Sequence, residues 1–412
     1  MIKISYKKHT KKLRCLNIFS FKLRKKMLRI TAFILCLINV LCLCSCWSQR
    51  ELETLAIVLG TALDVGDLPD TLKLTAQVVK ASEIGSNSST GGKTGEKAYV
   101  NISNTDESVL SAVRGLTHQQ NRALYFPHNE VLIFSSDLAK LDIAEGLDAF
   151  TRDYEARLNV NILISRGQAS EILKEDVDLE KMPALHIASM MNNQQSNSET
   201  VVITLRDFII ATLDQSTAPV VPMIELHEAD GKKHVILKDT AVFKHNRMIG
   251  ELDKVQTRGL LWVTNKFKSG VITVNTQWGQ VVLEILHASS KLKPIKGKDG
   301  KIHMELKIYT DGSVQSNETT EDMSNIKNVE MLKAKMSESI IKDIRYSLMQ
   351  ARTLSSDVFG FGEAIRRHYP KEWEKMKDNW DANFPSIELD THINVKLRST
   401  SGLIKPVVSG GK

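Results

Sequence analysis

The residues of this chain with the clearest chemical potential are its five cysteines, which all lie at or before position 46. A thiol can act as a nucleophile, bind a metal, form a disulfide or carry a covalent lipid. Because no cysteine follows Cys46, the first three of these are excluded for the body of the chain. Lipid attachment remains, and it depends on the residues that precede Cys46.

The segment before Cys46 has the pattern of an export signal. Residues 22–29 are strongly cationic, and residues 30–45 form an apolar run. A permanent membrane span needs about 20 apolar residues, so this shorter run predicts a secretory signal. Met27 is a second candidate start, since residues 27–45 alone make an adequate signal.

The end of the apolar run, Leu43-Cys44-Ser45-Cys46, resembles a lipobox. In a lipoprotein of this kind the cysteine thiol takes a diacylglyceryl group, and the signal peptide is cut immediately before it. We therefore predict signal cleavage between Ser45 and Cys46, a signal peptide over residues 1–45, and lipidation of Cys46. The two acyl chains would give stable anchoring. An uncleaved signal anchor with a buried Cys46 is the alternative.

The net charge of +7 belongs to the leader. Residues 1–45 hold eleven of the 55 Lys and Arg residues and no Asp or Glu, which leaves 44 basic against 48 acidic residues in the body. This balance gives no electrostatic reason to expect a nucleic-acid partner. Ordinary hydrophobic and charged fractions of 42% and 25% indicate a folded chain, and 412 residues indicate two or three domains.

Other motifs that could carry chemistry are weak. Residues 91–94 (GGKT) lack the earlier glycine of a phosphate loop, because position 87 is Asn87, so a hairpin tip is the better interpretation. No histidine spacing fits a zinc site, and no serine sits in a nucleophile elbow. His128 fits a loop hydrogen bond better than a site. We therefore assign no catalytic residue, no metal and no cofactor.

Two motifs near the C-terminus have structural explanations. The glycines of Asp357 to Gly362 lie between two helical patterns, which predicts a sharp turn that needs glycine backbone angles. Trp373 and Trp380 lie seven residues apart on one face of a predicted helix. Such a pair forms a core stripe more often than a partner surface.

The first half of the body predicts a mixed α and β lobe. Its expected elements include a helix that begins at Thr105 and a βαβ unit with a parallel strand pair. The strands are expected at 55–64, 71–79, 130–135 and 158–165, and further helices at 137–151 and 201–214.

The second half predicts helices packed on one face of a largely antiparallel sheet. Residues 326–351 repeat apolar side chains every three or four positions, and residues 387–398 alternate strictly. The fold class is therefore α+β (mixed α/β) and multi-domain. The expected domains are an N-terminal lipoprotein domain at 46–225, a small middle domain at 226–285 and a C-terminal domain at 286–405. Further elements are strands at 234–244, 271–275, 281–287 and 301–309, and a helix at 362–380.

Several short motifs along the body belong together. They cover nearly all of residues 46–405, and the C-terminal group is the most specific. In chain order they are Cys46-Trp47 with Glu51-Leu52 and Asp64; Arg152-Asp153 with Arg157 to Asn159; Thr240 to Lys244, Gly250 to Leu252 and Arg258 to Trp262; and Asp357 to Gly362, Tyr369 to Trp373, Trp380, Arg398 and Gly402.

With these motifs the mature chain resembles the Ger(x)C family, the lipoprotein C subunits of spore germinant receptors. The resemblance implies three mixed α and β domains without a recognised catalytic site. It also implies partnership with membrane A and B subunits, and a place at the outer face of the spore's inner membrane. Germinants of such receptors are small amino acids, sugars or nucleosides. Two departures are Ser48, where the family often has Asp, and a leader with 26 additional residues.

The predicted function is that of a lipid-anchored receptor subunit, needed for the germination response to small-molecule nutrients and not an enzyme. Two other functions remain open. A ligand-binding lipoprotein that captures the germinant itself would need a deep pocket with convergent polar groups. An exported hydrolase acting on cell-wall polymers would need a cleft with paired carboxylates. Whether this subunit binds a germinant is not decided by the sequence.

Overall fold

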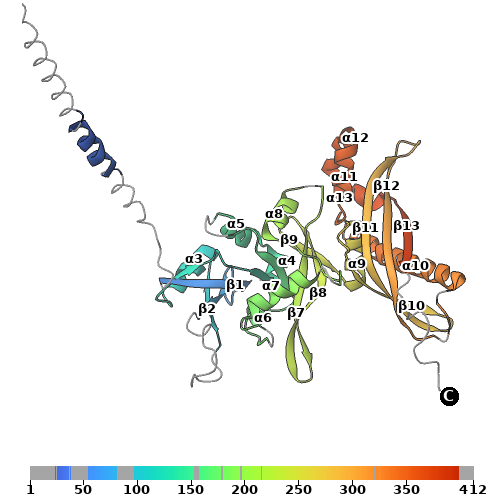
Figure 1. Ribbon diagram of the computed structural model, residues 1–412, viewed down its shortest axis with the longest axis horizontal. Helices are drawn as coiled ribbons and strands as arrows, with labels where there is room; N and C mark the ends of the chain where they lie inside the picture. The colour runs from blue at the N-terminus through green and yellow to red at the C-terminus, as the bar shows by residue number, and fades with distance from the viewer. Residues whose placement is uncertain are drawn as a thin grey trace, which may run out of the picture. The chain divides into compact units, whose positions relative to one another are not determined.

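The computed structural model describes residues 24, 26–36, 38 and 54–398, apart from 81–96, 153–156, 178–179, 195–196, 215, 320 and 324. Two compact units are present, Met1–Leu55 and Ala56–Lys412. In the first unit the described residues form an exposed helix over 26–36. Within the described residues, no helix combines the length and the apolar character that crossing a membrane requires. The second unit contains two sheets (Figure 1).

The first sheet has nine strands in the order β3-β2-β1-β5-β6-β7-β8-β9, with β4 paired to β1. The pairs β1–β5, β5–β6 and β6–β7 are parallel, which confirms the predicted βαβ unit. The strands are β1 (Leu55–Val65), β2 (Leu72–Val79), β3 (Tyr99–Asp106), β4 (Ala123–Tyr125), β5 (Val131–Ser135), β6 (Asn161–Ser165), β7 (Val220–Ala229), β8 (Lys232–Lys244) and β9 (Arg247–Leu252).

Helices cover both faces of the first sheet. Along β1, Ala56 and Val58 enter one buried cluster and Leu59 the other; after an irregularity between Val58 and Gly60, Ala62 and Leu63 again enter opposite clusters. Alternate side chains point to opposite faces of a strand, and a strand covered on both faces is therefore apolar throughout. One cluster contains residues of α3 (Val109–Thr117), α4 (Ser136–Leu141), α5 (Ala144–Arg152) and α8 (Leu205–Leu213), and the other of α6 (Ala169–Ile172) and α7 (Pro183–Asn193).

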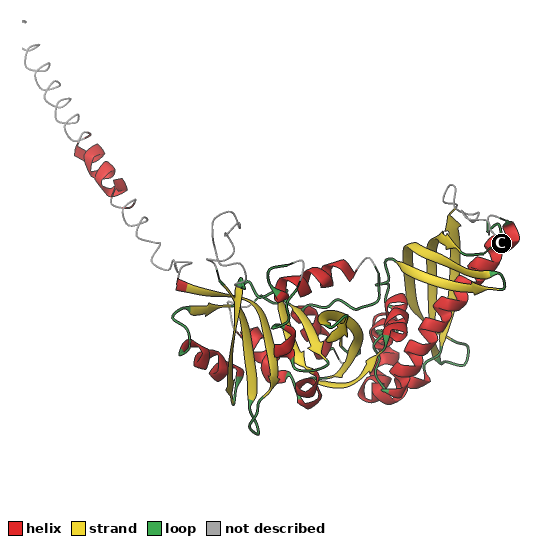
Figure 2. Ribbon diagram, turned by 90° about the horizontal axis from the view of Figure 1, so that it is seen from below, coloured by secondary structure: helices red, strands yellow, loops and turns green. Residues whose placement is uncertain are grey.

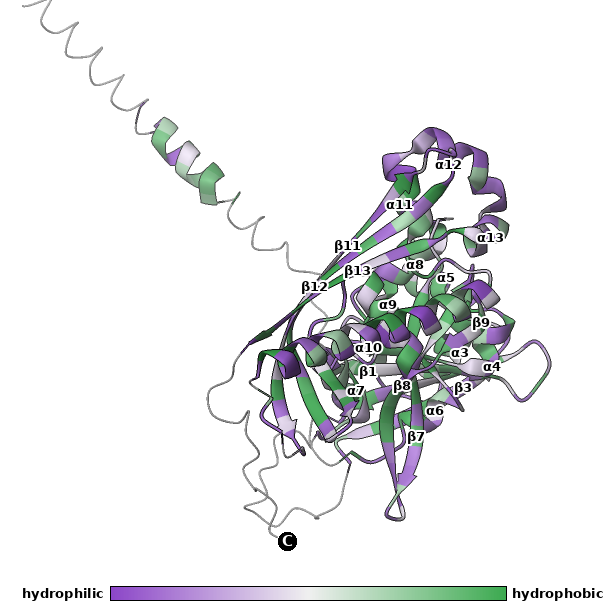
Figure 3. Cartoon of the chain, turned by 90° about the vertical axis from the view of Figure 1, so that its right-hand side faces the viewer, coloured by the Kyte–Doolittle hydropathy of each residue, from purple (hydrophilic) through white to green (hydrophobic). Residues whose placement is uncertain are grey.

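The second sheet has four strands in the order β10-β11-β12-β13. Two pairs are antiparallel, and β12 pairs with β13 in parallel. Hydrophilic and hydrophobic residues alternate along the long strands, as expected for a sheet with one covered face (Figure 3). The strands are β10 (Gly270–Thr276), β11 (Gly279–Lys296), β12 (Ile302–Asn317) and β13 (Leu389–Arg398).

The long helix α10 (Ile326–Thr353) runs across this sheet (Figure 2). Its predicted apolar stripe is confirmed, because Leu332, Met336, Ile340 and Ile344 are buried in one core with the inward side chains of the strands. The same core includes residues of α9 (Lys254–Val263), α11 (Phe361–His368), α12 (Pro370–Met376) and α13 (Trp380–Asn383), with the short 3-10 turns η3 (Lys377–Asn379) and η4 (Phe384–Ser386) between and after them. The mixed α and β fold class is confirmed.

Three predicted helices have different bounds in the structure. Thr105 continues β3 by pairing with β2, so the helix begins later, at Val109, behind the cap Ser108. The helix predicted at 137–151 is two helices, because Asp142 is extended. The helix predicted at 362–380 breaks before Pro370, where proline lacks an N–H and disfavours helical geometry in its predecessor.

Residues 226–285, predicted as a middle domain, supply strands to both sheets. β7, β8 and β9 complete the first sheet as far as Leu252, and β10 begins the second sheet at Gly270. α9 lies between them and packs against α10. The division of the body into domains at 226 and 286 stays a prediction.

A buried ion pair joins α9 to α10. Arg258 Nε lies 3.2 Å from Asp343 Oδ2, and both side chains are largely buried. The guanidinium also lies over the ring of Phe267, which stacks on Trp262. The two backbones approach so closely that a Cβ on Gly259 would lie 2.2 Å from the carbonyl oxygen of Asp343. Burial raises the pKa of Asp343 to about 6, against the opposing effect of Arg258.

This raised pKa predicts a pH dependence of stability. The folded value of about 6 lies above the ordinary value of 3.8, so the folded protein binds this proton more tightly. The stability that Asp343 contributes is therefore complete below about pH 4 and is lost as the pH rises through about 6. Asp343→Asn removes this titration.

Chemical denaturation at pH 4 and pH 7 measures the effect. We expect the unfolding free energy of wild type, relative to Asp343→Asn, to fall by roughly 2 kcal/mol between these pH values. Asp357 is present in both proteins, so its own titration cancels in the comparison. A difference that stays constant or grows with pH would show that Asp343 is not desolvated as described.

Candidate functional site

The predicted lipidation site, Cys46, and the cleavage position Ser45 lie outside the described residues. Both assignments therefore stay predictions. The 91–94 loop also lies outside them. In the described residues before Cys46, the helix over 26–36 exposes large apolar side chains, with Leu28 75% and Phe33 71% exposed.

The predicted turn at Asp357 to Gly362 is organised by one buried carboxylate. The buried carboxylate of Asp357 accepts backbone N–H groups of Phe359 at 3.1 Å, Gly360 at 3.0 Å and Gly362 at 2.7 Å. Gly360 is the N-cap of α11 and has a φ of 76°, a left-handed conformation that favours glycine. The sequence-based prediction of a glycine-dependent turn is confirmed.

This carboxylate combines two opposed effects. Complete burial raises the pKa of Asp357 to about 6, although the backbone N–H groups that donate to it favour the charged form. The N-terminal end of a helix also favours negative charge. Asp357 therefore accepts N–H groups at the N-terminus of α11 and, through the same hydrogen bonds, holds the loop at 358–362 in place.

Gly362 allows a close approach that no other residue would permit. A Cβ at this position would lie 2.6 Å from the carbonyl oxygen of Ser216, 2.9 Å from Trp380 and 3.0 Å from Trp373. The two tryptophan rings meet edge to face at 5.2 Å and are 5% and 4% exposed. Their interpretation as core residues is confirmed.

The turn also binds the segment that connects α8 to β7. The backbone N–H of Ala218 donates to the carbonyl oxygen of Asp357 at 2.7 Å. Arg366 Nη2 lies 2.9 Å from Asp214 Oδ2, and Ser216 donates to Asp214 through its amide and its hydroxyl. Partial burial acts to raise the pKa of Asp214, but the Ser216 hydrogen bonds and Arg366 outweigh it and hold that pKa below its ordinary value.

We call these residues the joint: Asp214, Ser216 and Ala218 on the first-sheet side, and Asp357, Gly360, Gly362 and Arg366 on the second-sheet side. Asp214 and Arg366 are separated by 152 positions, so no local pattern could pair them. The sequence pointed only to the glycines of the turn.

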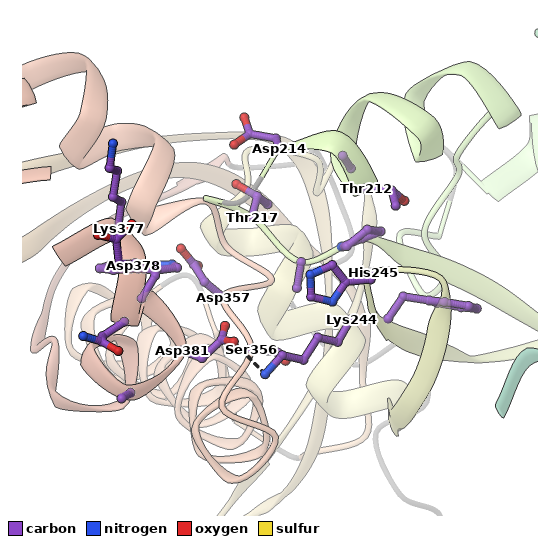
Figure 4. Close-up of a pocket in the computed structure, with 17 residues that line it drawn as sticks. Thr212, Asp214, Thr217, Lys244, His245, Ser356, Asp357, Lys377, Asp378 and Asp381 are labelled. Atoms are coloured by element: carbon purple, nitrogen blue, oxygen red, sulfur yellow. Dashed lines mark ion pairs between the residues drawn. The ribbon is translucent and has the colours of Figure 1, made fainter. Parts of the chain in front are cut away.

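A cleft of about 470 Å³ opens beside the joint (Figure 4). Lys244, at the end of β8, pairs with Asp381 of α13 at 2.6 Å. This cleft is lined by polar and charged residues at the ends of α8 and β8 and in η3, among them Thr212, Asp214, Lys244, His245, Lys377 and Asp378.

Three of the four carboxylates that line the cleft have partners of their own, Asp378 being the fourth. Asp357 accepts backbone N–H groups, Asp214 pairs with Arg366, and Asp381 pairs with Lys244. The hydroxyl of Ser356 donates to the carbonyl of Leu354. Among the described residues, no group of three or more His, Cys, Asp or Glu side chains could hold a metal ion. The arrangement suits a rigid contact or the binding of a small polar molecule better than proton transfer.

A second charged cluster surrounds Arg166, just after β6. Its guanidinium contacts Glu225 at 2.8 Å, Asp239 at 2.8 Å and Glu251 at 2.7 Å, which come from β7, β8 and β9. Burial raises the pKa of Asp239 despite Arg166. This cluster ties together the strands at the end of the first sheet. No local sequence pattern indicates this cluster, because its four members lie on separate elements.

Two family models match the chain. Residues 48–226 match the spore germination protein N-terminal domain, and residues 238–401 match the spore germination B3/GerAC-like C-terminal domain. The chain belongs to the Ger(x)C family of spore germination proteins. The C-terminal match includes the joint residues Asp357, Gly360, Gly362 and Arg366, and the N-terminal match includes Asp214.

Individual relatives match over most of their length. Spore germination protein YndF of Bacillus subtilis (strain 168) is 27% identical over 90% of this chain and 96% of its own. Spore germination protein KC of the same organism is 26% identical over 91% and 96%. A crystal structure of the GerBC protein has a TM-score of 0.53 at 17% identity and covers 82% of this chain and 97% of its own. That likeness shows the fold.

The joint predicts a specific response to substitution at Gly360. Valine there must adopt the left-handed φ of 76°, which a β-branched residue disfavours. We expect Gly360→Val to lower the free energy of unfolding by roughly 1–3 kcal/mol. Thermal melting followed by circular dichroism measures it.

Gly360→Asn is the matched control, because asparagine tolerates the left-handed region. It should lose clearly less stability than the valine variant, since the added Cβ meets no atom closer than 3.5 Å. Equal melting temperatures for wild type and Gly360→Val would refute the account of the turn.

Proposed function

We propose that this chain is the lipid-anchored C subunit of a spore germinant receptor. The observation that carries the proposal is the match of both family domains in succession over residues 48–226 and 238–401. The chain also aligns with nearly the full lengths of the relatives named spore germination protein B3, A3 and KC of Bacillus subtilis (strain 168). The subunit would act together with membrane A and B subunits in the response to small-molecule nutrients.

The lipobox at Leu43 to Cys46 supports attachment to the outer face of the spore inner membrane. A diacylglyceryl group on Cys46 confines the body to a layer at the membrane surface. This confinement raises its effective concentration near membrane partners. The role of the body is then contact, made by faces of the two sheets and their helices, with the joint holding these faces in one arrangement.

A second function, binding of the germinant by this subunit, is favoured by one observation. The cleft beside the joint has a volume of about 470 Å³, within the usual range for small-molecule sites, and contains both lysine and aspartate side chains. Such a lining suits a small molecule that carries both charges or several hydroxyl groups. We place this second, because Lys244 and Asp381 already satisfy each other.

Anchoring is tested by Cys46→Ala in spores. We expect the variant to lose lipid modification, to leave the membrane fraction and to support only a weak response to the cognate germinant. Metabolic labelling with a fatty acid and membrane fractionation measure the first two effects. Ser48→Ala is a control that should change neither. Lipid that persists on the Cys46→Ala chain would disprove the assignment.

Germinant binding is tested by calorimetry of the full-length chain in detergent against amino acids, sugars and nucleosides. We expect no affinity tighter than about 1 mM, equivalent to about −4 kcal/mol. Micromolar binding that Lys244→Ala abolishes would move the cleft and the ligand-binding function into first place.

A further inference from the structure

The edge strand β13 offers an unused row of hydrogen-bonding groups. It pairs with β12 on one side, and no further strand pairs with it in the part of the chain that the structure describes. The backbone N–H of Met304 donates to the carbonyl oxygen of Glu388. The even-numbered residues of this segment therefore direct their backbone N–H and C=O groups toward β12. The odd-numbered residues therefore direct their N–H and C=O groups to the free edge. They are Leu389, Thr391, Ile393, Val395 and Leu397.

This edge lacks three of the features that usually prevent strand pairing. Proteins blunt free edges with prolines, bulges, very short strands or charged side chains, and of these β13 has only the last. β13 has ten residues and no proline, and its register with β12 runs from Leu389 to Arg398 without a shift. In contrast, the register shifts within the β11–β12 pair and in three pairs of the first sheet.

The inward face of β13 is also incompletely covered. Leu389, Ile393, Val395 and Leu397 pack against the core of the second sheet but are only partly buried. On the neighbouring strand β12, Met304, Leu306 and Ile308 are fully buried. One more strand beside β13 would cover the exposed part of these apolar side chains.

The charge on the outward face of β13 changes sign along the strand. Glu388 lies immediately before the strand and Asp390 at its beginning, and Lys396 and Arg398 lie at its end. All four are exposed, and the side chain of Asp390 is 60% exposed. Two of the four have contacts on β12: Arg398 pairs with Asp311, and Asp390 Oδ2 lies 3.6 Å from Nε2 of His303, a contact that is an ion pair only when His303 is protonated. The argument rests chiefly on Asp390 and Lys396, because a neutral His303 leaves the charge of Asp390 uncompensated. An acidic start and a basic end are complementary to the same strand turned by 180°.

We propose that the free edge of β13 pairs, antiparallel and about a twofold axis at Ile393, with β13 of a second copy of this chain. In this register Asp390 of each copy lies opposite Lys396 of the other, and Glu388 lies opposite Arg398. Leu389 lies opposite Leu397 on the inward face. The two four-stranded sheets become one continuous sheet.

This register satisfies the backbone and the side chains together. The odd-numbered residues form the hydrogen-bonded pairs, which adds about ten backbone hydrogen bonds. The charged residues then fall in the pairs without hydrogen bonds, where opposite side chains come closest. The interface is self-complementary, as a twofold interface must be. It does not depend on the proposed receptor role, and confinement at a membrane would strengthen it.

Charge reversal on the full-length chain in non-ionic detergent tests the proposal, with self-association measured by sedimentation velocity. Asp390→Lys places a lysine at both 390 and 396, and Lys396→Glu places a carboxylate at both, so each variant sets like charges opposite each other in the proposed register. Each variant alone should associate at least tenfold more weakly than wild type. An equimolar mixture of the two should restore association, and so should the double variant. Lys298→Glu, an exposed reversal in the β11–β12 turn, is the control and should behave as wild type.

Three results would overturn the proposal. The first is a wild-type chain that stays monomeric up to about 100 μM. The second is dimerisation that is unchanged by Asp390→Lys, or that the double variant fails to recover while circular dichroism shows an intact fold. The third is a chain truncated after Arg398 that dimerises where the full chain does not, because residues 399–412 would then be the occupant of the edge.

Discussion

The carboxylate of Asp357 is the interaction on which the arrangement of the body depends. Without cysteines after position 46, no disulfide can join the two sheets of the body, and non-covalent contacts must hold their arrangement. Asp357 gathers three backbone N–H groups, starts α11 and places Gly362 against the carbonyl oxygen of Ser216. Its own carbonyl accepts the amide of Ala218. One buried residue therefore holds the loop, the start of α11 and the contact with the segment that connects α8 to β7.

A joint of this kind suits a protein that works through contact. Its charged groups are used within the molecule: Asp214 holds Arg366, and Asp381 holds Lys244 across the cleft. Groups committed in this way keep two surfaces in register, whereas a reaction centre needs groups that are free to exchange protons. The family membership of the chain agrees with a receptor subunit. The predicted lipid on Cys46 would hold such a subunit at the membrane, where partners meet its sheet and helix faces.

The sequence predicted the features that have a local period or a local conformational demand. The stripe of α10, the alternation of β13, the tryptophan pair and the turn at Gly360 are of this kind. It missed what depends on tertiary pairing. Thr105 belongs to β3 because it pairs with Lys73 of β2. Pro370 interrupts a helix that the apolar period alone predicted to be continuous. Asp214 and Arg366 form an ion pair although 152 positions separate them. The Arg166 cluster and the cleft were missed for the same reason, since each draws its residues from several separate elements.

Purification of the tagged, full-length chain from detergent-solubilised spore membranes tests the central claim, that this protein is a contact subunit of a membrane complex. Quantitative mass spectrometry of the purified material identifies its partners and their ratios. The account predicts that receptor subunits of the A and B types co-purify with the chain in constant proportion through successive chromatographic steps. A chain that purifies without either subunit, from membranes in which both are detected, would contradict it.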